Sequence, residues 1–293
     1  MDPKTMWGAG DYPAVAELIS DVGELCVEQA GIGAGMDVLD VACGSGNATI
    51  PAARAGANVT GLDFQPDLLA NARQRAQDEG IDVEWIEADA QQMPFDDQRF
   101  DRVISTFGHM FAPDHARTAS EMRRVLRPDG RIVICCWTPE GSIGRMFLTI
   151  GTLVPPPPGG QMPLLWGTEA HVQKLLGPAT FDRREVEWTH ESVDSYADFF
   201  LSSFGPMLNA AEALGERSGE LRKEFLAFLA DENLADDGSL LFRGEYLVSV
   251  VDTRALSRPR RRRRRKGVDA RAPHRGATPG ACGGSSTLPR RPD

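Results

Sequence analysis

The sequence has few of the features that mark a disulfide-stabilised, metal-binding or membrane-spanning protein. It contains only five cysteines, an odd number, with no CxxC pair and no histidine partner nearby, so we expect neither a disulfide framework nor a metal site. No window approaches the roughly 18 to 20 uninterrupted apolar residues of a membrane span. Residues 1–10 also lack a basic start followed by an apolar run. We therefore expect a cytoplasmic protein without a membrane span.

Basic residues are scarce in the first 253 positions, which hold 19 lysines and arginines against 40 acidic residues, a net charge of -21. A body this acidic would repel a phosphate backbone, which argues against a nucleic-acid substrate for the core. Residues 254–293 instead carry 13 basic and two acidic residues, including an unbroken arginine block at 260–265. Because this stretch has almost nothing to bury, we expect a disordered basic tail over residues 252–293. The block has no interleaved aromatic residues, so an accessory extension is a better interpretation than a nucleic-acid or membrane site.

The remainder of the chain alternates between strand-like and helix-like patterns. Short apolar runs predict strands at 36–43, 58–63, 83–88, 101–107, 131–137, 182–189 and 244–251. Helical spacing of apolar residues separates several of them and also predicts one amphipathic helix over 13–30. Strands that alternate with helices through short links predict an α/β fold with a doubly wound, mostly parallel sheet. In such sheets ligands bind beyond the carboxyl ends of the strands.

Three aspartates at successive strand ends surround a glycine-rich loop at 44–46. A Gly-x-Gly after a strand lets a ligand approach the backbone, but several kinds of nucleotide-binding fold share it. Asp40 lies within the first strand, where a carboxylate would disfavour a pyrophosphate and attract an ammonium or sulfonium group. Asp63 ends the second strand, where it would accept both ribose hydroxyls, and Asp89 follows the third, where it would accept from an adenine amino group. One such aspartate alone is more often a solvated residue or a helix cap, whereas the three together predict a positively charged nucleoside ligand.

Five segments of the chain carry a resemblance to a known family. They read VLDVACGSGN at 38–47, GLDF at 61–64, EADAQQMPF at 87–95, FD at 100–101 and RVLRPDG at 124–130. Taken together and in this order, they resemble the motifs of class I S-adenosylmethionine-dependent methyltransferases over residues 36–137. Within that superfamily the chain is most similar to the small-molecule methyltransferases of the ubiquinone/menaquinone-biosynthesis type. The resemblance implies a seven-stranded Rossmann-like sheet with an antiparallel last strand, S-adenosyl-L-methionine as methyl donor and S-adenosyl-L-homocysteine as product.

The resemblance also implies a division of the chain and a set of cofactor residues. Residues 1–36 would form an N-terminal helical lid, 37–137 the Rossmann-like cofactor-binding core, and 138–251 a substrate cap with the closing strands, since about forty residues after 137 are too many for a plain crossover loop. The implied cofactor site consists of Trp7, Asp40, Ala42, Gly44, Ser45, Gly46, Asp63, Phe64, Asp89, Ala90, Thr106 and Phe107. In this site Asp40 lies near the amino group of the methionine part, Asp63 holds the ribose, and Phe64 stacks on the adenine.

The acceptor is expected to face the segment after the fourth strand. We hypothesise that His109 removes or relays the acceptor's proton, because imidazole titrates near neutrality; the alternative is a histidine that only bonds the loop backbone. The candidate acceptor contacts are Met110, Phe111, Trp166 and Phe204, with packing in the core or cap as the alternative. Methyl transfer from a sulfonium is an in-line displacement that depends on alignment rather than on a covalent nucleophile. We expect the acceptor to be a small organic molecule, and its reacting atom, oxygen, nitrogen or carbon, is left open. We expect the protein to be a monomer or a homodimer.

Three other functions stay open. An NAD-dependent oxidoreductase would share the sheet, but Asp40 and the presence of Thr49 in the third glycine's place disfavour it. A non-catalytic protein that binds S-adenosylmethionine would keep the pocket without turnover. A nucleic-acid methyltransferase is disfavoured because the segment 105–108 reads STFG, without the Asn/Asp-Pro-Pro-aromatic run of enzymes that methylate the exocyclic amines of bases.

Overall fold

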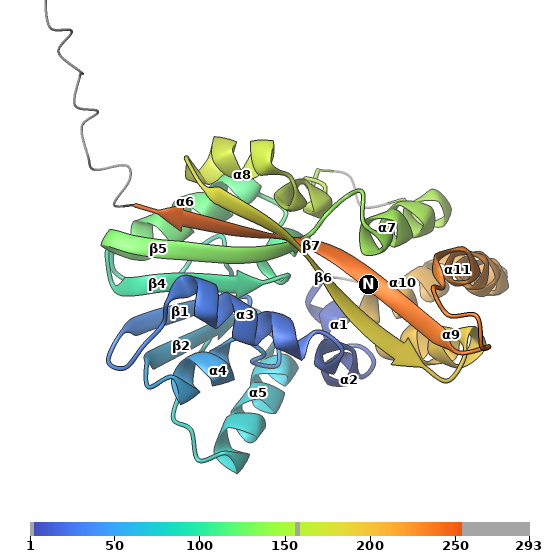
Figure 1. The fold of residues 1–293 in the computed structure, drawn as a ribbon, viewed down its shortest axis with the longest axis horizontal. Helices are drawn as coiled ribbons and strands as arrows, with labels where there is room; N and C mark the ends of the chain where they lie inside the picture. The colour runs from blue at the N-terminus through green and yellow to red at the C-terminus, as the bar shows by residue number, and fades with distance from the viewer. Residues whose placement is uncertain (1–2, 156–158, 254–293) are drawn as a thin grey trace, which may run out of the picture. The chain divides into compact units, whose positions relative to one another are not determined.

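The computed structural model describes residues 3–155 and 159–253, in which seven strands form one sheet (Figure 1). The strands are β1 (Asp37–Val41), β2 (Asn58–Asp63), β3 (Glu84–Glu87), β4 (Phe100–Thr106), β5 (Leu126–Trp137), β6 (Thr180–His190) and β7 (Leu240–Asp252). Their order is β3-β2-β1-β4-β5-β7-β6, with β1 to β5 paired in parallel and β7 antiparallel to both of its neighbours. This order confirms the doubly wound, mostly parallel sheet and its antiparallel last strand.

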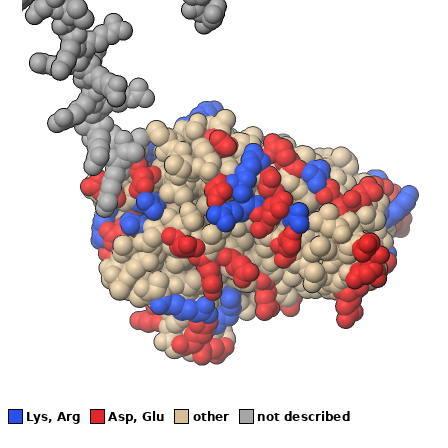
Figure 2. All heavy atoms as spheres, viewed as in Figure 1, with Lys and Arg blue, Asp and Glu red and all other residues tan. Residues whose placement is uncertain are grey.

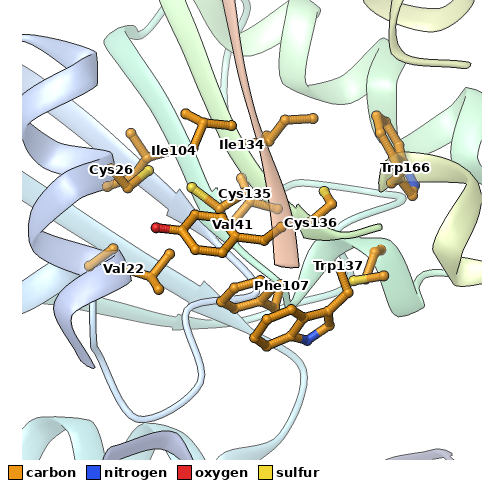
Figure 3. Close-up of a cluster of buried hydrophobic side chains, with 14 of the residues drawn as sticks. Val22, Cys26, Val41, Ile104, Phe107, Ile134, Cys135, Cys136, Trp137 and Trp166 are labelled. Atoms are coloured by element: carbon orange, nitrogen blue, oxygen red, sulfur yellow. The ribbon is translucent and has the colours of Figure 1, made fainter. Parts of the chain in front are cut away.

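Helices cover both faces of the parallel half of the sheet. Packed on one face are α3 (Ser20–Ala30), α4 (Thr49–Arg54) and α5 (Pro66–Asp78), and on the other α6 (His115–Val125) and α8 (Glu169–Leu176). Strands covered on both sides must be apolar almost continuously, which explains the run of buried side chains in β1, β4 and β5. Figure 3 shows part of this core, where Val22 and Cys26 of α3 lie beside Ile104 and Ile134 of the sheet.

A second group of helices lies beyond the carboxyl ends of the parallel strands (Figure 1). It consists of α7 (Ser142–Leu153), α9 (Val193–Ser203), α10 (Gly205–Leu214) and α11 (Ser218–Glu232). The long β6–β7 hairpin extends from the sheet into this group and packs against α7 and α9. We refer to these four helices as the cap. Two 3-10 turns, η1 (His109–Phe111) and η2 (Pro163–Gly167), join the sheet to its surroundings, and a third, η3 (Gly215–Arg217), links α10 to α11.

The N-terminal segment differs from the single helix expected over 13–30. It forms α1 (Pro3–Trp7) and α2 (Tyr12–Glu17), and α3 begins only at Ser20. The side-chain amide of Asn47 donates to the carbonyl of Ala16 at 2.7 Å, which satisfies a carbonyl in the last turn of α2 and fixes the end of that helix. The chain then turns, so that α2 packs against α5 and α9 instead of continuing along α3.

The boundary of the basic tail is also corrected. Asp252 ends β7 and pairs with Arg131, and the backbone N–H of Thr253 donates to the carbonyl of Gly130 at 3.2 Å. The fold therefore continues two residues past the expected boundary at 251. The expectation of disorder from residue 254 onward lies outside the described residues. Within the described ranges, no helix is both long and apolar enough to cross a membrane.

Candidate functional site

The loop after β1 has an unusual backbone. Ala42, Gly44 and Gly46 have φ values of 54°, 54° and 88°, in the left-handed region that non-glycine residues rarely adopt. The backbone N–H of Cys43 donates to the carbonyl of Leu62 at 3.0 Å, which anchors the loop on β2. A Cβ atom added to Gly44 would meet only the ring of Tyr12, at 3.8 Å. The peptide groups of this glycine loop, residues 42–46, are thus presented toward the N-terminal segment.

Asp40 is fully buried at the end of the central strand β1. Its Oδ2 accepts a hydrogen bond from the hydroxyl of Thr49 at 2.6 Å, whereas its Oδ1 is buried without any partner. Burial, together with the nearby carboxylate of Asp63, raises the pKa of Asp40 to about 7. An ionised carboxylate in such a place is costly unless a cation or further donors reach it. The free oxygen of Asp40 therefore suits a ligand that carries a positive charge.

Asp63 lies beside it, at the end of β2, and is tied to the glycine loop. Its Oδ2 accepts from the backbone N–H of Gly44 at 2.8 Å, and its Oδ1 accepts from that of Gln65 at 2.9 Å. Burial raises the pKa of this carboxyl too. The hydroxyl of Ser45 is a third buried polar group here and has no hydrogen-bond partner. Two carboxylates and an unpaired hydroxyl fit a ligand that brings both an ammonium group and hydroxyl groups.

The other residues expected to bind the cofactor also lie at the carboxyl ends of the strands. Phe64 is half-buried directly after β2, and Thr106 ends β4. Asp89 is exposed after β3, where its carboxylate accepts from the backbone and side-chain N–H groups of Gln91. Ala90, next to it, is buried. The structure therefore gathers the expected set at one edge of the sheet, with Asp89 oriented by its own turn.

The N-terminal segment packs across this edge. Lys4 forms an ion pair with Glu87 at the end of β3, and the side-chain amide of Gln65 donates to the Lys4 carbonyl at 2.9 Å. Trp7 follows and is 9% exposed, with its ring 5.5 Å from that of Tyr12 and 4.7 Å from that of Phe111. Trp7 thus forms part of a pocket wall.

That pocket lies between the N-terminal segment, the sheet edge and the cap. Its empty volume is about 520 Å³, part of which is open to solvent. Its lining consists of Trp7, Tyr12, Val15, Leu18, Ile19, Phe107, Phe111, Trp137, Ile143, Met146, Phe147, Trp188, Tyr196, Phe200 and Phe204. Phe107 and Trp137 stack at 3.9 Å between ring centroids and form one side of it (Figure 3). None of these residues is charged, and burial raises the pKa of Tyr12 to about 12 and that of Tyr196 still higher. No side chain of the lining is therefore a base near neutral pH.

Phe111 and Phe204 line this pocket, but three other residues expected near the acceptor do not. His109 is fully buried outside the pocket, with Nδ1 2.9 Å from the Ser105 hydroxyl and Nε2 3.3 Å from the Cys136 sulfur. Burial lowers the pKa of His109 to about 3, so its imidazole is neutral. Met110 and Trp166 are fully buried in the core, where the Trp166 ring packs against His109 at 4.8 Å. This geometry speaks against His109 as the base, because both ring nitrogens are engaged and the residue does not line the pocket.

Several residues that shape the site were not expected from the sequence. Thr49 was noted only as a missing glycine, yet it is the one hydrogen-bond donor to Asp40 among the described residues. Tyr196 and Phe200 line the pocket together with Phe204; their spacing of four residues places the first two on one face of α9, and Phe204 directly follows the end of that helix. That spacing is a signal in the sequence that would have identified this wall.

Comparisons with known proteins agree with this geometry. A family described as a methyltransferase domain matches residues 38–130. An uncharacterized protein of Mycobacterium tuberculosis is 39% identical over 261 residues, covering 86% of this chain and 94% of the relative. The demethylmenaquinone methyltransferase of Thermus thermophilus is 40% identical over 114 residues, which is 38% of this chain and 52% of that enzyme. The crystal structure of a putative methyltransferase from Bacillus halodurans shares the fold, with a TM-score of 0.54 and 21% identity over 78% of this chain and 96% of that one.

The raised pKa of Asp40 predicts a pH-dependent gain in stability for Asp40→Asn. In the unfolded chain an aspartate has a pKa of about 4, so between pH 4 and 7 the folded protein holds a proton on Asp40 that the unfolded chain has lost. The free energy of unfolding of the wild type therefore falls as the pH rises through this range. Asparagine does not ionise. The variant's free energy of unfolding, measured with denaturant, should therefore exceed that of the wild type by an amount that grows from near zero at pH 4 to as much as about 4 kcal/mol above pH 7.

The control for this measurement is Asp89→Asn, which removes the same charge from an exposed position. It should leave the free energy of unfolding within about 0.5 kcal/mol of the wild type. A difference between Asp40→Asn and wild type that is constant with pH, or that shrinks as the pH rises, would contradict the burial of an ionisable carboxyl at this position.

Proposed function

The chain belongs to the class I S-adenosylmethionine-dependent methyltransferases, related to the menaquinone-type enzymes, and from this premise we propose that it methylates a small, uncharged organic acceptor bound in the aromatic pocket. One observation carries the proposal. A pair of buried carboxylates, one with an unpaired oxygen, adjoins a pocket that holds no charge. Tyr12 and Phe107 connect the two, because Tyr12 lies close to Gly44 as well as lining the pocket, and Phe107, which also lines the pocket, directly follows β4, the strand paired with β1.

The residues at the sheet edge fit S-adenosylmethionine. Oδ1 of Asp40 would accept from the ammonium of its methionine part, and the Ser45 hydroxyl would bond its polar groups. Asp63 would accept from the ribose hydroxyls while Phe64 and Ala90 enclose the adenine. When bound, this cofactor supplies an electrophilic methyl group on a positively charged sulfur. Carboxylates close to the glycine loop favour such a cation electrostatically and would repel a pyrophosphate, which speaks against the dinucleotide alternative.

The pocket's own contribution is to hold the acceptor and to exclude water. The Phe107–Trp137 stack forms one wall and Trp7 packed on Phe111 another, so a flat or branched apolar molecule would be restrained on two sides. Restraint of this kind accounts for much of the rate of an in-line displacement. Because no residue of the lining takes up a proton near neutral pH, the acceptor enters with its nucleophilic electron pair already available.

The surface gives no support to a nucleic-acid acceptor. On the face shown in Figure 2, lysines and arginines are interleaved with acidic residues. Many arginines of the described chain form ion pairs, such as Arg54 with Glu79 and Arg243 with Glu187. A continuous basic surface, which a phosphate backbone needs, is therefore not present on that face of the described chain.

The proposal predicts labelled product from labelled S-adenosylmethionine and a fractionated metabolite extract, with one equivalent of S-adenosylhomocysteine released per methyl group transferred. Asp63→Ala should bind S-adenosylhomocysteine at least about tenfold more weakly by calorimetry, because the hydrogen bond to Gly44 is lost along with the ribose contacts. Asp78→Ala, an exposed carboxylate near the end of α5 that contacts Gln74, is the matched control and should bind normally. Binding without turnover on any fraction would identify a non-catalytic cofactor-binding protein, and binding of NADH alone would identify an oxidoreductase.

The absence of a base in the pocket predicts the shape of the pH profile. For an acceptor that must lose a proton, kcat/KM should rise with pH at the acceptor's own pKa, and a related acceptor whose pKa is one unit lower should move the midpoint by about one unit. Tyr196→Phe, which removes a hydroxyl from the lining, should leave the midpoint in place. A midpoint that stays constant when the acceptor is changed would show that a protein group titrates instead.

A further inference from the structure

A series of hydrogen-bonded polar side chains lies in the core next to the cofactor site and the acceptor pocket. The Ser105 hydroxyl donates to the carbonyl of Val41 at 2.5 Å. His109 Nδ1 lies 2.9 Å from the same hydroxyl, and His109 Nε2 lies 3.3 Å from the sulfur of Cys136. All four residues are buried, and they belong to β4, β1, η1 and β5. This hydrogen-bonded series therefore connects the carboxyl ends of the three adjacent strands β1, β4 and β5.

The direction of each hydrogen bond follows from the number of protons available. A hydroxyl has one hydrogen, and that of Ser105 is given to Val41, so Ser105 must accept from Nδ1–H of His109. The neutral imidazole then carries its lone pair on Nε2, which accepts from the thiol of Cys136. Burial raises the pKa of that thiol, so it keeps its proton. His109 is thus held in a single tautomer.

The two ring nitrogens lead to two different sites. The Nδ1 side ends at Val41, the residue before Ala42, where the left-handed backbone of the glycine loop begins. The Nε2 side ends at Cys136, next to Trp137, whose ring stacks on Phe107 in the pocket wall (Figure 3).

The backbone beside His109 fits the glycine loop closely. A Cβ atom on Gly108 would lie 2.2 Å from the Ala42 carbonyl oxygen, so these two loops touch directly and leave no space for adjustment. A shift of the imidazole would therefore reach both sites.

We propose that His109 is a positioning residue that sets the glycine loop through Ser105 and the Phe107–Trp137 wall through Cys136, and so holds the cofactor site and the acceptor pocket at a fixed separation. This role goes beyond the proposed function and uses it only for the choice of the cofactor-site probe. It also replaces the catalytic role that the sequence suggested. The imidazole acts on the reaction through its neighbours and never contacts the acceptor.

The two sides of the imidazole can be tested separately with amides. The side-chain nitrogen of asparagine takes the place of Nδ1, so His109→Asn keeps donation to Ser105 and loses the contact to Cys136. The longer glutamine reaches the position of Nε2, so His109→Gln keeps an acceptor for the Cys136 thiol and loses the bond to Ser105. His109→Leu removes both. The probes are S-adenosylhomocysteine for the cofactor site and Nile red, an uncharged aromatic dye, for the pocket.

We expect His109→Leu to raise both dissociation constants about tenfold, the loss expected for one buried hydrogen bond to each site. His109→Asn should bind S-adenosylhomocysteine within about threefold of the wild type but Nile red about tenfold more weakly, and His109→Gln should show the opposite pattern. His115→Leu is the matched control. His115 is also buried against Trp166 but bonds His171 at 2.9 Å, so its loss should lower Tm without changing either constant.

The proposal is overturned if the asparagine and glutamine variants weaken both probes equally or weaken neither, or if His115→Leu gives the same pattern as His109→Leu. These outcomes describe a histidine that only stabilises the fold. A failure of the proposed function looks different, because the wild-type protein itself would then not bind S-adenosylhomocysteine.

Discussion

The buried carboxylate of Asp40 is the constraint on which the site depends. Asp40 is the second-last residue of β1, which pairs with β2 on one side and β4 on the other, and it is fully buried. One hydrogen bond from Thr49 leaves half of its capacity unused, and Asp63 adds a second carboxylate close by. Keeping two such groups apart from solvent costs stability, and binding of a cation offsets that cost. The left-handed glycine loop then lets the ligand approach the backbone closely enough to reach them.

The electrostatic contrast between the two halves of the site has a chemical consequence. The cofactor side is negative, whereas the acceptor side is aromatic and uncharged. In a pocket lined by apolar and aromatic side chains, an alignment of acceptor and methyl donor that is set before reaction contributes more than a titrating side chain does. The position of His109, buried with both nitrogens engaged, agrees with a pocket that orients an acceptor which has already given up any proton to solvent before it binds.

The sequence predicted the sheet well and placed the expected cofactor residues at its strand ends, because both depend on local patterns. Buried parallel strands read as short apolar runs; Asp40 and Asp63 are among the last residues of β1 and β2, and the glycine loop follows β1 directly. The acceptor side was predicted poorly, because it depends on contacts between distant segments. Nothing near His109 shows that η2, more than fifty residues later, covers it with Trp166. Nothing within 13–30 shows that Asn47 bonds the carbonyl of Ala16 in the last turn of α2. Only the spacing of Tyr196, Phe200 and Phe204 carried a local signal for the pocket.

The most direct test of the central claim is the count of protons released when S-adenosylhomocysteine binds. With a pKa of about 7, Asp40 of the free protein is largely protonated at pH 6.5, and the ligand's ammonium should ionise it. Calorimetric titrations in buffers of different ionisation enthalpy should then show release of about three quarters of a proton at pH 6.5, little release at pH 8.5, and none at either pH for Asp40→Asn. Binding heats at pH 6.5 that do not depend on the buffer would contradict the claim that a buried, half-satisfied carboxyl receives the cofactor.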